Sequence, residues 1–257
     1  MEVVLGARLE ANDGPRSQTV TDLLRAALLD GRIAPDSRLF ELDLCRQFKV
    51  SRTPIRAALQ TLAGEGLLDY TPNRGYSVRA YTLSEITDTY EMRALAEGLA
   101  ARLAAERGLT PAQQTEIEQA LGLVDNALNR HGIDTQTLRS VYTEANKRFH
   151  RAIHEAANSR VVVDVVRLFQ RVPHTSAHNV VGFGLERVRM RHMDHHAIFE
   201  AILCREPKKA EDLMRAHILA VKNTAARALA QRSLAEDMPV EAPKRRRVTR
   251  AKAVVVA

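Results

Sequence analysis

Tryptophan is absent from this chain of 257 residues, and aromatic residues make up only 4% of it. β-Sheet proteins draw on aromatic and β-branched residues, whereas this sequence is rich in Ala, Leu and Arg, which favour helices. The composition therefore predicts a mostly α fold. The length exceeds the usual size of one domain, which predicts two domains with separate cores.

Cysteines and long apolar runs are also scarce. The two cysteines are Cys45 and Cys204, and neither a signal peptide nor an apolar run of about 18 residues is visible. These absences predict a cytoplasmic protein in a reducing compartment, with no membrane partner.

Signatures of catalysis are missing as well. The sequence has no Gly-rich phosphate loop and no Gly-x-Ser-x-Gly, and no acidic residue precedes a histidine by three positions, as di-iron bundles require. His154 and Glu155 begin a zinc-protease pattern, but Asn158 occupies the place of the second histidine. We therefore expect that the protein is not an enzyme.

Basic charge is concentrated at the C-terminus. Six basic residues and one glutamate follow Met238, which accounts for +5 of the formal net charge of +7. We expect residues 234–257 to form a basic, disordered tail. This tail is an alternative site for nonspecific binding of nucleic acid, because the rest of the chain is nearly neutral.

The N-terminal part has the pattern of a winged helix-turn-helix. Residues 1–15 show no periodicity and are expected to be a disordered lead-in. Helical spacing predicts helices over Val20–Leu29 and Glu41–Phe48, and Ser51 with Pro54 predicts the start of a third helix that runs through Leu62. Turn residues at 72–75 then predict a β-hairpin, so residues 16–80 form the first predicted domain.

Residues 82–233 have helical periodicity throughout and are predicted to form an antiparallel all-helical bundle. Thr110, Pro111 and Gln113 have the spacing of a capping box, while Gly108 and Gly132 end helices. About six helices are expected, including ones over Asp134–Ala157, Ser159–Val172, Leu185–Arg205 and Pro207–Arg232.

A basic face is predicted around the third helix. No acidic residue lies between Leu44 and Gly64. The same stretch contains four basic residues, Arg46, Lys49, Arg52 and Arg56. At the start of a recognition helix, Arg can donate two hydrogen bonds to guanine, and Ser or Thr hydroxyls can bind phosphate. Ser51 and Thr53 hold such positions. The plainer alternative is that Ser51 only caps the helix and the arginines are solvated.

The string "LRAALLDGRIAPDSRLFELDLCRQFKVSRTPIRAALQTLAGEGLLDYTPNRGYSV" resembles the N-terminal domain of the GntR family of regulators. The resemblance implies that the start of the recognition helix contacts bases and that the wing tip approaches the minor groove. By position, the implied contacts are Ser51, Arg52, Thr53, Arg56, Arg74 and Gly75. Leu42 replaces an arginine of some members, and we expect Arg46 to take over that contact.

Four side chains in the second half could hold a metal ion. Asn146 and His150 are four residues apart on one predicted helix, and His195 and His217 lie on the last two helices. Three imidazoles and one amide oxygen suit a divalent transition metal such as zinc or nickel. Nine histidines also give accidental pairs, so exposed or singly hydrogen-bonded side chains are the alternative.

The strings "NKRFHRAIHEAANSR", "DHHAIFEAIL" and "LMRAHI" resemble the FCD effector domain of the FadR subgroup. Many such domains bind a metal through Asp or Asn, a His four residues later and two further His, which implies Asn146, His150, His195 and His217. His196 is the alternative to His195. The remaining candidates, expected to be exposed, are His154, His174, His178 and His192.

The resemblance also aligns Arg93 with an arginine near the effector cavity of FCD domains. Its predicted role is to bind the carboxylate of an effector. The alternative is an ion pair with Glu97, four residues away on the helix surface.

The predicted function is a ligand-responsive, homodimeric transcription regulator that binds operator DNA and a small carboxylate metabolite together with a divalent metal. The alternative is a metal-dependent enzyme domain fused to a DNA-binding module. That alternative needs an acid or base near the metal, and the sequence shows none at a recognisable spacing.

Overall fold

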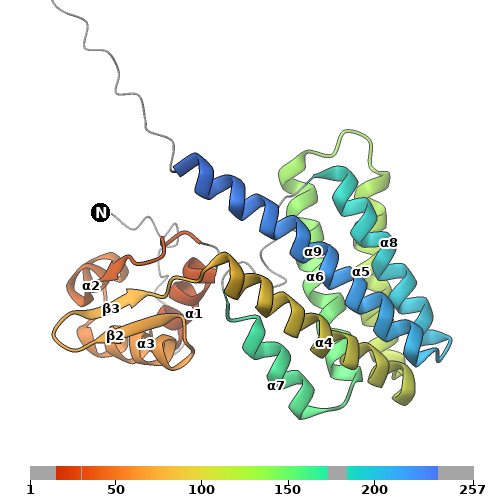
Figure 1. Ribbon diagram of the computed structural model, residues 1–257, viewed down its shortest axis with the longest axis horizontal. Helices are drawn as coiled ribbons and strands as arrows, with labels where there is room; N and C mark the ends of the chain where they lie inside the picture. The colour runs from red at the N-terminus through yellow and green to blue at the C-terminus, as the bar shows by residue number, and fades with distance from the viewer. Residues whose placement is uncertain (1–15, 30, 173–183, 237–257) are drawn as a thin grey trace, which may run out of the picture.

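The computed structural model describes residues 16–29, 31–172 and 184–236, and the side chains at positions 16–18 and 229–236 are not described. The predicted lead-in, most of the predicted tail, His174 and His178 lie outside these ranges. Figure 1 shows two bodies joined near residue 80. The first is small and contains three helices with a sheet, and the second is a helical bundle.

The first body has the order α1 (Arg16–Leu29), β1 (Arg38–Leu39), α2 (Glu41–Phe48), α3 (Arg52–Gly64), β2 (Leu68–Thr71) and β3 (Gly75–Val78). The antiparallel sheet has the order β1-β3-β2. Its core is built from aliphatic residues that recur with helical spacing, including Leu24, Leu28, Ile55, Leu59 and Leu62. The winged helix-turn-helix fold is therefore confirmed.

Local backbone chemistry sets the boundaries around the helix-turn-helix. α2 ends at Phe48 and is capped by Lys49, which has a left-handed conformation with φ of 53°, and α3 begins after Ser51. The hairpin turns at Asn73 and Gly75, whose φ angles are 61° and 79°. Asn and Gly adopt this region more readily than other residues. Strand β1 was not predicted, because two residues are too few to show alternation.

The second body contains α4 (Leu83–Arg107), α5 (Pro111–Asn129), α6 (Thr135–Ala156), α7 (Arg160–Phe169), α8 (Leu185–Leu203) and α9 (Pro207–Glu236). The predicted capping box at Thr110 is present, and Thr82 with Glu85 forms another at the start of α4. Asp134 and Ser159 cap α6 and α7. The predicted antiparallel bundle is thus confirmed. α9 ends at Glu236, four residues beyond the predicted Arg232.

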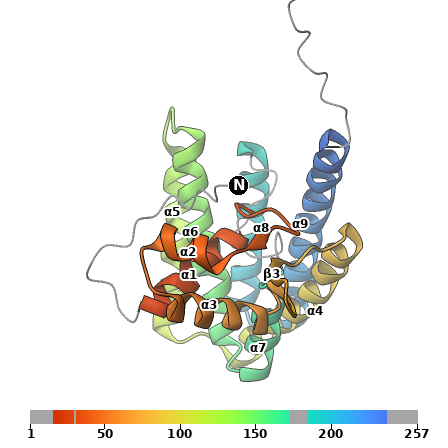
Figure 2. The same cartoon turned by 90° about the vertical axis from the view of Figure 1, so that its left-hand side faces the viewer.

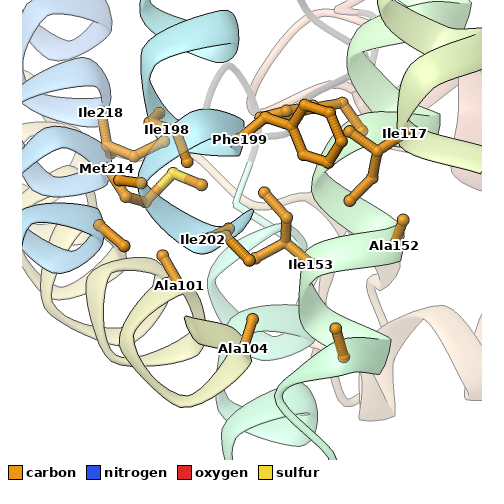
Figure 3. Packing of buried hydrophobic residues seen from close by; sticks show 14 of the residues in the cluster. Ala101, Ala104, Ile117, Ala152, Ile153, Ile198, Phe199, Ile202, Met214 and Ile218 are labelled. Atoms are coloured by element: carbon orange, nitrogen blue, oxygen red, sulfur yellow. The ribbon is translucent and has the colours of Figure 1, made fainter. Parts of the chain in front are cut away.

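Helices α4 and α9 lie side by side (Figure 1), and the small residue Gly98 lies at their contact. A Cβ atom on Gly98 would lie 2.5 Å from Cγ of Arg215 and 3.2 Å from the backbone oxygen of Glu211. Ala101 and Ala104 of α4 belong to the same core cluster as Met214 and Ile218 of α9, and Ala101 lies near Met214 (Figure 3). Short side chains therefore let α4 approach both α9 and the α6–α8 layer.

The two bodies are linked through a short segment before α4. The Tyr81 hydroxyl donates to the carbonyl oxygen of Gly66 at 3.0 Å, and Arg79 forms an ion pair with Asp69 of β2. Figure 2 views the molecule from the side of the winged helix, with the bundle behind it. Among the described helices, none combines the length and hydropathy needed to cross a membrane.

Candidate functional site

The start of α3 presents polar side chains to solvent. Ser51, Arg52 and Thr53 are exposed, and the Ser51 side chain makes no capping hydrogen bond although its backbone is in the N-cap position. The alternative that the Ser51 side chain only caps the helix is therefore wrong. The first backbone N–H groups of a helix lack partners within it and can bind an anion.

Two arginines of the predicted basic face have acidic neighbours from α2. Nε of Arg56 lies 2.9 Å from Oε2 of Glu41, and Nη1 of Arg46 lies 3.4 Å from Oδ1 of Asp43. Both carboxylates lie just before Leu44, outside the sequence window that suggested an uncompensated basic face. Ion pairs between exposed side chains are weak, about 0 to 1 kcal/mol, so DNA phosphates can compete for these arginines.

The wing tip is formed by the turn between β2 and β3. The backbone N–H of Arg74 donates to the carbonyl of Thr71 at 3.0 Å, and the Arg74 side chain is exposed. Gly75 has open space where a Cβ atom would lie. The predicted wing residues thus lie at an accessible tip.

In the bundle, three predicted histidines come together from three helices. We call His150 of α6, His195 of α8 and His217 of α9 the central cluster. All three are buried, and each offers a ring nitrogen within 4.8 Å of the other two. The Nε2 atoms of His195 and His217 are 3.3 Å apart. A tetrahedral zinc ion with bonds of about 2.0 to 2.1 Å holds neighbouring nitrogens about 3.3 Å apart, which fits this pair.

Two carboxylates orient the central cluster. Nδ1 of His150 lies 2.7 Å from Oε2 of Glu97, and Nδ1 of His217 lies 3.0 Å from Oδ2 of Asp194. A neutral imidazole that donates from Nδ1 to a carboxylate keeps its lone pair on Nε2. This is the second-shell arrangement that fixes the tautomer of metal-binding histidines and raises their basicity.

Glu97 is fully buried and connects several groups. Nε of Arg93 donates to its Oε1 at 2.6 Å, and Nε2 of His154 lies 3.2 Å from Oε2. The predicted alternative for Arg93, an ion pair with Glu97, is therefore present, but its location on the helix surface was wrong because Arg93 is only 3% exposed. The exposed location expected for His154 was wrong too, since it is buried against Glu97.

Burial favours the neutral forms of His150 and His195. Burial lowers the pKa of His150 to about 4, although Glu97 opposes this shift. Burial and the neighbouring His217 and His150 hold the pKa of His195 well below its usual value. Burial alone would raise the pKa of Glu97, but Arg93 and His150 bring it well below its usual value. Neutral imidazoles beside charged carboxylates are the protonation states that metal binding needs.

The remaining predicted candidates lie on α6 and α8. Asn146 is buried on α6, one turn before His150. His196 is half-exposed and lies near Asp125, so the structure brings His195 rather than His196 into the central cluster. His192 is buried, which contradicts the expectation of an exposed side chain.

The acidic residues of this site were not predicted from the sequence. No acid was expected near the predicted metal ligands, but Glu97 and Asp194 both contact them. Asp194 was detectable as the neighbour of His195, and Glu97 was expected only as a possible surface partner of Arg93. Burial of the facing sides of α4 and α6 turned that surface pair into part of the site.

The fold combines an exposed helix-turn-helix with a separate helical bundle that holds a buried histidine cluster. This combination is typical of transcription regulators that bind DNA and carry a ligand-binding domain. Residues 16–78 match the family model of the bacterial regulatory proteins of the gntR family, and residues 88–220 match that of the FCD domain. The chain therefore belongs to the GntR family, in the group with an FCD domain, and is a DNA-binding transcription regulator rather than an enzyme.

Curated relatives support this assignment. The chain is 25% identical over 198 residues to the uncharacterized HTH-type transcriptional regulator YdhC of Bacillus subtilis. This match covers 77% of this chain and 83% of YdhC. It is 27% identical over 208 residues to the HTH-type transcriptional repressor RspR of Escherichia coli, spanning 79% and 86% of the two chains.

Solved structures show the same architecture. A putative GntR transcriptional regulator from Rhodococcus sp. RHA1 has a TM-score of 0.61 and 25% identity, covering 83% of this chain and 98% of that one. McbR/YncC of E. coli has a TM-score of 0.65 and 20% identity, and the match covers 86% of this chain and 100% of that one. This similarity indicates a shared fold.

Proposed function

We propose that the bundle senses a small carboxylate metabolite through a divalent metal held by the central cluster, and that this changes operator binding by the winged helix. The observation that carries the proposal is the set of three buried imidazoles, two of them oriented by carboxylates. Titratable groups whose pKa is shifted by burial and by specific charged partners cluster at functional sites, which favours a ligand-binding role for this group.

The donor set suits a transition metal such as zinc or nickel. His150, His195 and His217 would supply three nitrogens, and Asn146 a fourth, weaker oxygen donor. Such an ion would supply a Lewis-acidic centre with positions open to a carboxylate. We propose that Arg93 contributes to the effector response through Glu97. Arg93 donates a hydrogen bond to the Glu97 carboxylate, and this carboxylate contacts Nδ1 of His150. Operator DNA, a homodimer and a cytoplasmic location complete the proposal.

Metal binding should raise the stability of the wild-type protein. A ligand that binds only the folded state at a hundredfold excess over its Kd adds about 2.7 kcal/mol. Chelation should therefore lower the Tm of wild type more than that of His217→Ala, as scanning calorimetry would measure. The site assignment is wrong if both proteins respond equally to the chelator.

The Asn146→Asp variant tests the fourth donor. If the side chain is a ligand, the added negative charge should tighten metal binding, because a carboxylate attracts a dication more strongly than an amide does. Competition with a chromophoric chelator measures the affinity. Weaker metal retention in Asn146→Asp would show that position 146 is not a ligand.

The DNA-binding face is tested by Arg52→Ala and Arg56→Ala. Loss of a bidentate base contact should weaken operator binding by about 1 to 3 kcal/mol and reduce the preference for operator over random DNA. Fluorescence anisotropy at fixed salt measures both affinities. Arg160→Ala is the control, because it removes the same charge from an exposed position on α7. An unchanged operator-to-random ratio in Arg52→Ala would contradict the base-reading role.

A further inference from the structure

A second group of metal-ligand side chains lies on α5 and α8, outside the central cluster. We call Asp125, His192 and His196 the outer cluster. His192 and His196 are one turn apart on α8, and Asp125 of α5 faces both. Among the described residues, the outer cluster shares no ligand with the central cluster.

Three ligand atoms of the outer cluster converge on one point. Oδ1 of Asp125 lies 2.7 Å from Nε2 of His192 and 3.2 Å from Nε2 of His196, and the two Nε2 atoms are 3.1 Å apart. Metal–ligand bonds of about 2.1 Å at right angles would place neighbouring ligand atoms about 3.0 Å apart. The three contacts thus have the dimensions of one face of an octahedron.

Hydrogen bonds alone cannot satisfy this triangle. Each neutral imidazole carries one N–H, and a carboxylate at neutral pH carries none. At most two hydrogens therefore serve three contacts. If both Nε2 atoms carry a hydrogen, both donate to Oδ1 of Asp125, and the 3.1 Å contact between the two nitrogens has no hydrogen bond. A metal ion would satisfy all three contacts with lone pairs.

The outer cluster is open to solvent on one side. A hollow of about 300 Å³ is lined by the three ligands together with Asn129, Arg189 and Met193. The side chains of Asp125 and His196 are 45% and 48% exposed, so an ion can reach them directly. The coordination positions of the metal that lie opposite the three protein ligands would open into this hollow. The positive charge of Arg189 would favour an anionic ligand at these positions.

We propose that Asp125, His192 and His196 form a second divalent transition-metal site, independent of the central cluster. Its affinity is lower than that of the central cluster for a structural reason. Nδ1 of His192 is buried without a hydrogen-bond partner among the described residues, whereas His150 and His217 are each oriented by a carboxylate. Second-shell partners of this kind typically change metal affinity about 10- to 100-fold.

Titration of the chelator-stripped full chain with Co²⁺ tests the proposal. His196→Ala and Asp125→Ala should each bind one equivalent fewer than wild type and lose the weaker phase of the titration. His217→Ala should lose the tighter phase and keep the weaker one. Because Asp125 and His196 are half-exposed, their replacement leaves the core intact.

The matched control is His131→Ala, which removes an exposed histidine from the segment between α5 and α6. It should bind as many equivalents as wild type. If His196→Ala and Asp125→Ala retain the wild-type stoichiometry, or if His131→Ala loses the same equivalent, the outer site is refuted. Failure of the central site would appear differently, as a His217→Ala titration identical to that of wild type.

Discussion

Replacing Glu97 with Gln is expected to destabilise the helical domain by about 3 to 5 kcal/mol. The Glu97 carboxylate is fully buried and accepts from Arg93 at 2.6 Å. Gln has nearly the same shape but no charge, so the Arg93 guanidinium would lose its buried ion pair with Glu97. Urea unfolding followed by circular dichroism measures the change.

The control for this prediction removes both charges. The double variant Arg93→Met/Glu97→Met should regain most of the lost stability, because exchanging a buried ion pair for apolar side chains of similar volume is often nearly neutral. A double variant as unstable as Glu97→Gln alone would show that shape and the contacts to His150 dominate. A Glu97→Gln variant within about 0.5 kcal/mol of wild type would contradict the prediction itself.

The metal-stripped protein should lose about 3 kcal/mol of stability between pH 6.5 and pH 4 through His150 alone. Its pKa is lowered from 6.5 to about 4 by burial, so the unfolded state binds a proton first as the pH falls. The contribution is therefore fully present above pH 6.5 and is lost as the pH drops toward 4. His195 shifts in the same direction and adds to the loss.

Unfolding free energies measured at half-unit pH steps check this dependence. His150→Gln cannot titrate at position 150, so its stability should fall less steeply over the same range. His131→Ala, which removes an exposed histidine outside the cluster, is the control variant. Parallel curves for wild type and His150→Gln would show that His150 does not carry the shift.

Local signals in the sequence were sufficient for much of the fold. The helix predicted over Glu41–Phe48 has those bounds in the structure, and the capping box at Thr110 is formed. Both depend on residues within one turn of each other, so tertiary contacts are not needed to recognise them. Strand β1 depends instead on pairing of Leu39 with Tyr76, a contact distant in sequence.

The site was harder to predict, because its chemistry depends on which helix faces meet. The family resemblance helps to select His150, His195 and His217. Asp194 was not predicted, and Glu97 was predicted only as a surface partner of Arg93. Charged residues are rarely buried unless paired, so a surface location was the better guess for Glu97. His192 was expected to be exposed because its buried position depends on the packing of α5 against α8, which periodicity alone does not reveal.

Helix α4 connects the histidine cluster to the winged helix. It carries Glu97 at the histidine cluster and begins at Thr82, next to the Tyr81 hydroxyl that binds the winged helix. At a rise of 1.5 Å per residue, the arm between Glu97 and Thr82 is about 22 Å long. A tilt of about 5° at Glu97 would therefore swing Thr82 sideways by about 2 Å. Since the proposed homodimer would have to match two half-sites at a fixed spacing on DNA, such a tilt would change how well the protein fits its operator.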